Sequence, residues 1–374
     1  MLYPCQVKDK ISLSRLLLKT LLLFAALNLL FAAANPLPTL GRLSAYNVLF
    51  PGRPRLPYGD QPALSYNVSL FNLDAMFASH IIAGEPKPAD EYRVILIGDS
   101  SVWGFLLTPE QTLDAYLNAA HLITSGGKTL RTYNLGYPTL SLTKDLLILQ
   151  RALVYDPDLI VWLTTLEAFP SSKQLASPIV QNNPETIRAL LSTYHLPLDP
   201  RDPALIQPTF WDRTIIGQRR ALADILRLQL YGVLWSATGL DQYFPEIYDL
   251  RAEDLEADDS FYGLPNPLTP DLLAFDLLRA GVQMAGDVPV LLVNEPMFIS
   301  AGQNSNIRYN FYYPRWAYDQ YRFLLSEQTA QHGWNYLDLW NTIPNSEFTN
   351  TAIHLTPAGS QQLAEKIGEA ILKR

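Results

Sequence analysis

Two residues far apart in the sequence could together perform nucleophilic chemistry. Ser100 stands in Gly98-Asp99-Ser100-Ser101, directly after the apolar residues 94–97, and His354 stands just before Thr356-Pro357, a pair typical of a helix start. Ligands bind at the carboxyl ends of strands in open parallel sheets. A serine there becomes a nucleophile when a histidine accepts its proton. The pair therefore predicts acyl transfer, with Ser100 as nucleophile and His354 as general base.

Gly-Asp-Ser after the first core strand, with a late histidine before a helix, resembles the SGNH (GDSL-type) hydrolase family. The resemblance runs from about Arg93 to the C-terminus, with a large interruption. It implies a flavodoxin-like, doubly wound parallel sheet of five strands and hydrolase activity on ester bonds. It also implies oxyanion donors on the backbone N–H groups of Ser100 and Gly136. Gly136 follows the second expected strand, where a plain strand-ending turn is the other interpretation.

Two positions depart from the family pattern. The third strand is usually followed by Gly-x-Asn-Asp, whose asparagine is a further oxyanion donor, but here Glu167 falls near its place. The aspartate usually found three residues before the histidine is replaced by Thr351, preceded by Asn350. Either residue could hold the imidazole by a hydrogen bond, but neither supplies a negative charge. Loss of the triad acid costs roughly 10⁴ in kcat.

The missing acid leaves three alternatives: a Ser-His dyad, a carboxylate recruited from elsewhere, or a catalytically weak site. Glu295 and its neighbour Asn294 follow the fourth expected strand, and Glu167 follows the third. These side chains could orient His354 or bind a polar group of the substrate. Anchoring of its own loop is the other role open to Glu295.

Strand-like and helix-like segments alternate from residue 92 onward. We expect strands at residues 94–97, 130–135, 159–163, 288–293 and 336–339, and helices from 108 and over 141–154, 314–331 and 356–372. A further short helix is expected within 66–83. Such alternation predicts a parallel, doubly wound sheet within a domain spanning residues 65–374.

Residues 168–286 interrupt the alternation. They carry many prolines and two helical stretches, at 214–234 and 270–285. A structureless loop of this length is unusual inside a compact domain. We therefore expect a helical insertion or lid over the carboxyl edge of the sheet.

The N-terminal residues 1–34 read as an export signal. Lys8, Lys10, Arg15 and Lys19 precede or enter an apolar run over 16–34, close to the length of about 20 residues that spans a membrane. A cleavable signal peptide and a signal anchor with a transmembrane helix both fit, and the long basic region favours the anchor. The positive-inside rule then places the rest of the chain outside the cytoplasm. Residues 35–64, rich in Pro, Gly and Arg, predict a linker.

Composition excludes several classes of protein. Of 374 residues, 48% are hydrophobic and 17% are charged, which excludes a largely disordered chain. A net charge of −8 argues against a nucleic-acid partner. The single cysteine, Cys5, excludes an internal disulfide and a cysteine-based zinc site. We expect no metal and no cofactor.

The sequence thus predicts an extracytoplasmic, membrane-tethered serine esterase or O-acyltransferase. The expected substrate is an acylated small molecule, or an acyl ester of a cell-envelope glycan or lipid, and the membrane is the other expected partner. The alternative is a non-catalytic binding or assembly protein of the cell envelope that kept the fold and lost the full site. The missing asparagine and aspartate support that alternative.

Overall fold

A parallel β-sheet forms the centre of the molecule. The computed structural model describes residues 12–49, 73–78, 80–84, 86–205, 208–238 and 244–374. The strands are β1 (Glu91–Ile97), β2 (Thr129–Asn134), β3 (Leu159–Thr164), β4 (Val290–Asn294) and β5 (Asn335–Asp338). They form one five-stranded sheet in the order β2-β1-β3-β4-β5, with every neighbouring pair parallel. This is the flavodoxin-like order, so the predicted fold class is confirmed.

The inner strands β3 and β4, and the second half of β1, are apolar on both faces because both faces are covered. Along β1, Val94 and Leu96 point into one hydrophobic cluster while Ile95 and Ile97 point into the other. Every residue of β3 is buried, whereas the edge strand β5 is half exposed. Sequence periodicity located all five strands to within a few residues.

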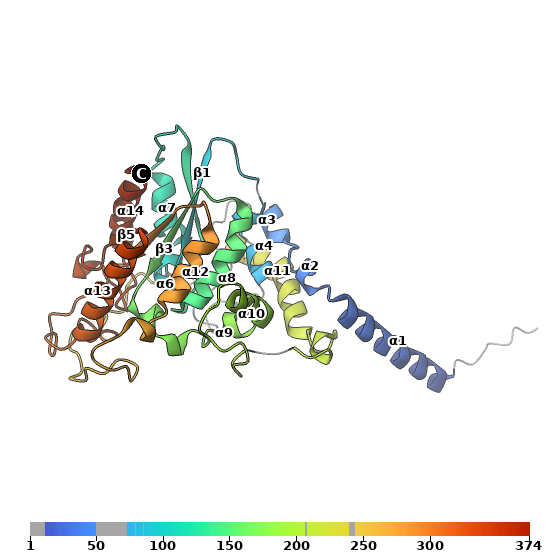
Figure 1. Cartoon of the computed structure of the whole chain (residues 1–374). Coiled ribbons are helices and arrows are strands. Elements are labelled where there is room, and N and C mark those ends of the chain that lie inside the picture. Colours follow the sequence, from blue (N-terminus) through green and yellow to red (C-terminus); the bar gives the residue numbers. More distant parts are fainter. Residues whose placement is uncertain (1–11, 50–72, 79, 85, 206–207, 239–243) are drawn as a thin grey trace, which may run out of the picture.

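Helices cover both faces of the sheet (Figure 1). On one face lie α8 (Leu142–Ala152), α12 (Phe275–Ala285) and α13 (Arg315–His332), and on the other lie α7 (Leu113–Ala119) and α14 (Pro357–Leu372). Gly281 of α12 permits a close approach to the sheet, because a Cβ atom there would lie 2.3 Å from the Trp162 ring. Shorter elements connect these layers: α4 (Leu73–Ala78), α5 (Ile81–Gly84), η1 (Pro109–Gln111), η2 (Leu153–Tyr155) and η7 (Asn345–Glu347).

The segment expected to form a helical insertion, residues 168–286, combines four α-helices with turns and long irregular stretches. It contains α9 (Pro178–Gln181), α10 (Pro184–Thr193), α11 (Arg219–Thr238), α12, and the turns η4 (Ser171–Lys173), η5 (Trp211–Arg213) and η6 (Pro270–Leu272), and it is preceded by the turn η3 (Leu166–Ala168). Ile179, Ile187 and Leu190 are buried in the same cluster as α8, so α9 and α10 extend the core. The later residue Leu255 donates its N–H to Gln303 O at 3.0 Å, in the loop that follows β4.

The N-terminal segment begins with one long helix. α1 (Leu13–Ala34) is followed by α2 (Leu37–Leu40) and α3 (Ala45–Leu49). Gln229 of α11 accepts a hydrogen bond from the Ala45 N–H at 2.6 Å and donates one to Leu43 O at 2.7 Å. The first part of the predicted linker is thus folded onto α11, while residues 50–64 lie outside the described residues. So do residues 65–72, and the expected helix within 66–83 is represented by α4 and α5.

Candidate active site

Ser100 and His354 meet at the carboxyl edge of the sheet. Ser100 opens the short helix α6 (Ser100–Trp103), which follows β1, and its Oγ lies 2.8 Å from Nε2 of His354. His354 is 7% exposed, and Ser100 is partly exposed. The sequence separates the two residues by most of the domain, and the sheet topology brings them into hydrogen-bond distance.

The turn between β1 and α6 requires a glycine at position 98. A Cβ atom on Gly98 would lie 2.4 Å from Cγ2 of Val102 and 3.1 Å from the Leu163 carbonyl oxygen of β3. Asp99 then caps α6, because its Oδ1 accepts the Ser101 N–H at 2.7 Å. Gly98 and Asp99 therefore fix the turn on which Ser100 is presented.

Asn350 is the residue that orients the imidazole of His354. Its Oδ1 lies 3.0 Å from Nδ1 of His354. Thr351 acts on the backbone instead, because its Oγ1 accepts the His354 N–H at 3.1 Å. An amide oxygen on Nδ1 favours the tautomer that carries its proton there, and this leaves the Nε2 lone pair for the Ser100 hydroxyl. The Ser-His-Asn arrangement matches the logic of a catalytic triad with an uncharged third member.

The environment of His354 keeps its imidazole neutral. Burial lowers the pKa of His354 to about 3. The Phe105 ring lies 4.7 Å away, centroid to centroid, and contributes to that apolar surrounding. A neutral imidazole can accept the Ser100 proton at neutral pH. Without a carboxylate partner, however, the imidazolium that forms during the reaction has only hydrogen bonding to stabilise it.

Glu295 does not reach His354. Its Oε2 accepts a hydrogen bond from the Ser101 hydroxyl at 2.5 Å, on the other side of the α6 turn. Glu295 is 2% exposed and forms a buried carboxyl pair with Asp99, which is 4% exposed. Burial, followed by the repulsion between the two carboxyl groups, raises the pKa of Glu295 well above its usual range. The pair supports the turn beneath Ser100, and the role of recruited triad acid does not fit Glu295.

A buried lysine lies near this carboxyl pair and binds the turn that presents Ser100. Lys144 of α8 donates from Nζ to the Gly98 carbonyl at 2.7 Å and to the Tyr137 carbonyl at 3.1 Å. It also forms an ion pair with Asp145 at 2.5 Å. Its positive charge acts against the rise in the pKa of Asp99 that burial produces. Lys144 thereby ties α8 to the turns that follow β1 and β2.

The other acidic and polar candidates bind elsewhere. Glu167 contacts Lys173 and the Tyr262 hydroxyl, and it makes no contact with His354. Asn294 ends β4, where it donates to Oδ1 of Asp338 at 2.9 Å and accepts from Tyr321 at 3.2 Å. The structure thus brings Ser100, His354, Asn350 and Thr351 together and leaves Glu167 and Asn294 outside that group.

Gly136 does not offer a free N–H in this structure. Its N–H donates to Oδ1 of Asn134 at 2.9 Å. A Cβ atom at Gly136 would lie 2.4 Å from the Trp103 backbone nitrogen, so glycine is needed for α6 to pack on the loop after β2. Gly136 thus has a packing role in this structure, and its expected oxyanion role stays a prediction. The Ser100 N–H remains a candidate donor, because the first N–H groups of a helix have no partner within it.

Asn134 is a structural residue of the site that the sequence did not single out. It donates from Nδ2 to the Val102 carbonyl of α6 and to Oδ1 of Asp114 of α7, both at 2.8 Å. With the Gly136 N–H on its Oδ1, Asn134 joins β2, α6 and α7 in one network. The signal that could have found it is an amide side chain at the last residue of β2, directly before the loop that contains Gly136.

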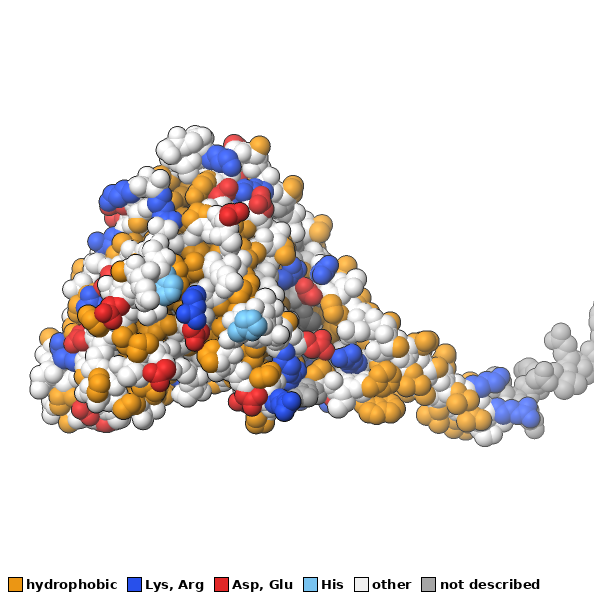
Figure 2. Space-filling model, in the orientation of Figure 1, with side chains coloured by type: hydrophobic (Ala, Val, Ile, Leu, Met, Phe, Trp, Pro, Cys, Tyr) orange, Lys and Arg blue, Asp and Glu red, His pale blue; other side chains and the backbone are white. Residues whose placement is uncertain are grey.

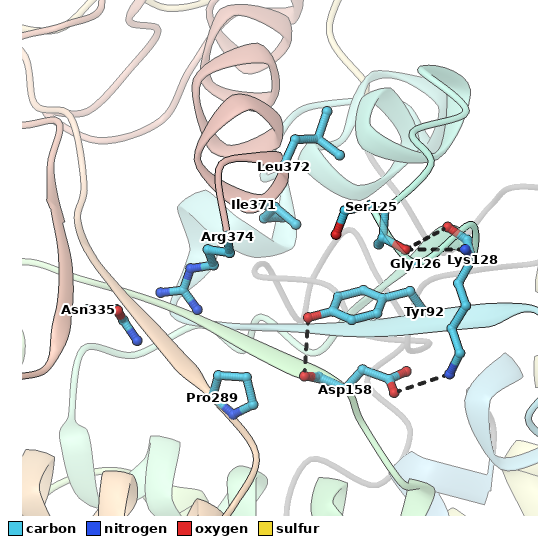
Figure 3. Close-up of a pocket in the computed structure, with 11 residues that line it drawn as sticks. Tyr92, Ser125, Gly126, Lys128, Asp158, Pro289, Asn335, Ile371, Leu372 and Arg374 are labelled. Atoms are coloured by element: carbon cyan, nitrogen blue, oxygen red, sulfur yellow. Dashed lines mark hydrogen bonds and ion pairs between the residues drawn. The ribbon is translucent and has the colours of Figure 1, made fainter.

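A surface pocket lies at the opposite edge of the sheet. It is a cavity of about 660 Å³ near the amino ends of the strands, and Figure 3 shows the residues that line it. The lining residues include Tyr92 of β1, Asp158 and Pro289 just before β3 and β4, and Asn335 of β5. None of the residues around Ser100 takes part. Among the residues that the structure describes, no group of three or more His, Cys, Asp or Glu side chains could hold a metal ion.

Comparison with known proteins finds resemblance only among solved structures. No family model and no curated protein matches the sequence. A member of the lipolytic protein G-D-S-L family from Veillonella parvula is 11% identical, with a TM-score of 0.35 over 74% of this chain and 96% of that one. Est24, a carbohydrate acetylesterase from Sinorhizobium meliloti, is 12% identical, with a TM-score of 0.34 over 75% and 98%. The inhibitor-bound M. smegmatis aryl esterase is 11% identical, with a TM-score of 0.35 over 75% and 98%.

Proposed function

We propose that this protein is a serine esterase or O-acyltransferase. The observation that carries the proposal is the 2.8 Å contact between Ser100 Oγ and His354 Nε2, with Asn350 on the other ring nitrogen. Ser100 is the nucleophile, His354 the general base, and Asn350 the positioning residue. Acyl transfer needs this combination of a hydroxyl, a neutral imidazole and a fixed tautomer.

The reaction follows from the positions of these groups. Ser100 Oγ attacks the ester carbonyl carbon while its proton passes to Nε2 of His354. The ester C–O bond then breaks, and the same proton goes to the departing alkoxide, which leaves as an alcohol. Water or a sugar hydroxyl attacks the acyl-enzyme, gives its proton to His354, and releases an acid or a new ester. The proton finally returns to Ser100 Oγ.

The substrate and location of this reaction form the second part of the proposal. We place the catalytic domain outside the cytoplasm, tethered by α1, with an acyl ester of a cell-envelope glycan or lipid as substrate. In support, α1 is an apolar helix of 22 residues whose side chains are mostly exposed. Lys8 and Lys10 precede it, and basic residues flank the cytoplasmic end of a span.

A fluorophosphonate probe tests the enzymatic part. Such probes bind covalently to a serine that a neighbouring base activates. We expect the full-length protein and Ser101→Ala to become labelled, and Ser100→Ala to stay unlabelled. Ser101 is a matched control because it is the adjacent hydroxyl and is bonded to Glu295 instead of a histidine. Absence of labelling in the unmodified protein, or equal labelling of Ser100→Ala, would contradict the proposal.

The non-catalytic alternative also has specific support. The Gly136 N–H is occupied by Asn134, and His354 lacks a carboxylate partner. A protein with this fold and a catalytically inactive site would bind a ligand of the cell envelope without forming an acyl-enzyme. The labelling experiment separates the two functions, because only the enzyme gives a Ser100-dependent adduct.

Topology has a test that uses the single cysteine of the chain. Cys5 precedes α1, so a membrane-impermeant maleimide should label it in inside-out vesicles and not in intact cells. Labelling in intact cells would reverse the proposed orientation. A mature protein that lacks Cys5 would show that the signal is cleaved.

A further inference from the structure

Helix α1 has one covered stripe on an otherwise exposed apolar surface. Asn28 and Ala32 are 7% and 3% exposed, whereas Leu22 and Leu30 are 62% and 66% exposed. Residues four apart share one face of a helix, so Asn28 and Ala32 mark a single line of contact. Figure 2 shows hydrophobic side chains along the part of α1 that extends away from the domain.

The segment around η5 contacts this stripe. The Ile216 N–H donates to Oδ1 of Asn28 at 3.3 Å, and α1 packs against η5. This segment carries three large apolar side chains that face solvent: Phe210, Trp211 and Ile216, which are 47%, 67% and 54% exposed. The Phe210 and Trp211 rings touch edge to face, with centroids 5.7 Å apart. We call these three residues the η5 patch.

The contact with Asn28 sets the depth of the η5 patch. α1 contains 22 residues, so at about 1.5 Å per residue it is about 33 Å long, close to the thickness of about 30 Å of a bilayer core. Asn28 lies about 9 Å before the end of α1 by the same rise. A segment bonded to Asn28 therefore lies beside the span, about 9 Å inside its outer end, which is within the depth of about 5–10 Å at which interfacial segments bury their apolar side chains.

We propose that the η5 patch inserts into the lipid interface next to α1. The inference rests on the proposed anchoring by α1. Aromatic rings with a polar edge are enriched at this level of a membrane, and an exposed tryptophan beside a span fits it. The neighbouring Arg219 and Arg220 are exposed and suit lipid phosphates, while Asp212 is held by Thr209. With α1 alone as anchor, the domain could rotate relative to the membrane. A second membrane contact at the η5 patch fixes its tilt.

Lipid quenching of a fluorescent label tests the η5 patch. In the full chain with Cys5→Ser, a bimane label is attached at Trp211→Cys or at the control Ile123→Cys. Ile123 is a matched control because it is 61% exposed, close to the 67% of Trp211. It forms a β-bridge with Thr129 at the amino edge of the sheet. In phosphatidylcholine–phosphatidylglycerol vesicles with nitroxide-labelled acyl chains, we expect strong quenching at position 211 and little at 123. Equal quenching at both positions, in protein that floats with the vesicles, would overturn the proposal.

Two further outcomes separate this proposal from its premises. Protein that fails to float with the vesicles would overturn the anchoring by α1 and the η5 patch together, while Ser100 labelling would still test the enzymatic function. Protection of position 211 that persists in detergent and follows formation of a dimer would also overturn the proposal. That result would assign the patch to a second copy of the chain.

Discussion

At the scale of single residues, the site consists of a serine, a histidine and an asparagine in hydrogen-bond contact. Ser100 and His354 could be found from sequence because each stands in a local pattern of turn and helix-start residues. Asn350 and Thr351 were left as alternatives, because spacing does not show which side chain reaches a ring nitrogen. The position of Glu295 could not be predicted, since its contact with Ser101 joins the ends of β1 and β4.

The uncharged partner of His354 gives a first prediction, on pH dependence. Burial lowers the pKa of His354 to about 3, so the imidazole stays neutral between about pH 5 and pH 8. The rate of fluorophosphonate labelling should therefore be nearly constant between about pH 5 and pH 8. In Asn350→Asp, a carboxylate beside Nδ1 favours the protonated imidazole and raises the pKa of His354.

The acid limb of the labelling profile of Asn350→Asp should accordingly move to higher pH, with slower labelling at the acid end. Asn350→Ala, which removes the hydrogen bond without adding charge, serves as the control and should label slowly at every pH. Identical profiles for Asn350→Asp and the unmodified protein would contradict the role of Asn350.

The buried carboxyl pair gives a second prediction, on stability. The folded-state pKa of Glu295 is raised, so its contribution to stability is present below its unfolded pKa of about 4.3 and is lost as the pH rises through the folded value. The Glu295→Gln side chain does not ionise. The variant therefore loses no stability as the pH rises, and it removes the charge repulsion between position 295 and Asp99. Heat unfolding of the full chain in detergent should show the variant gaining on the unmodified protein from pH 5 to pH 8. Glu110→Gln, at an exposed position, should show no such gain.

At the scale of elements, patterns in the sequence predicted the positions of the strands well. They did not predict the close packing contacts between one element and another. Apolar runs located β1, β3 and β4, because strands covered on both faces need apolar residues. β2 and β5 carry polar residues, and they followed from the alternation of strand-like and helix-like segments. The helix expected from Thr108 begins later. Thr108 and Gln111 close a capping box around the single turn η1, and α7 starts only after the extended residue Thr112. The packing of Gly136 on α6 is a contact between elements, which local patterns do not encode.

A third prediction concerns the contact between the loop after β2 and α6. In Gly136→Ala, the added methyl group would meet the Trp103 backbone nitrogen at 2.4 Å, so α6 and Ser100 must shift. We expect a loss of about 1–3 kcal/mol in unfolding free energy, typical of overpacking, together with slower labelling of Ser100. Gly126→Ala is the matched control, since its nearest contact would be 3.9 Å away. Equal stability of the two variants would contradict the packing role.

At the scale of the whole molecule, a doubly wound domain is joined to an apolar helix through α2, α3 and α11. Basic and apolar residues in the first 34 positions predicted such a helix, because the signal is local and compositional. The contacts of α3 with Gln229 could not be predicted in the same way. They join segments far apart in the chain through one half-buried side chain.

A fourth prediction concerns retention in the membrane. Leu22 and Leu23 are both 62% exposed near the middle of α1, where each added arginine costs about 2.5–3.5 kcal/mol. Leu22→Arg combined with Leu23→Arg should move the protein from the membrane pellet to the soluble fraction after alkaline extraction. Leu43→Arg, at a 57% exposed position outside α1, should remain in the pellet. Retention of the double variant would show that α1 is not the anchor.

The most direct test of the account is the location of the acyl group in the acyl-enzyme. The protein is exposed to an activated acetyl ester, quenched in acid and digested, and the peptide containing residues 98–101 is sequenced by tandem mass spectrometry. We predict an acetyl group on Ser100, which disappears in His354→Ala. An acetyl group on Ser101, or no acetylated peptide from correctly folded protein, would contradict a mechanism built on Ser100 and His354.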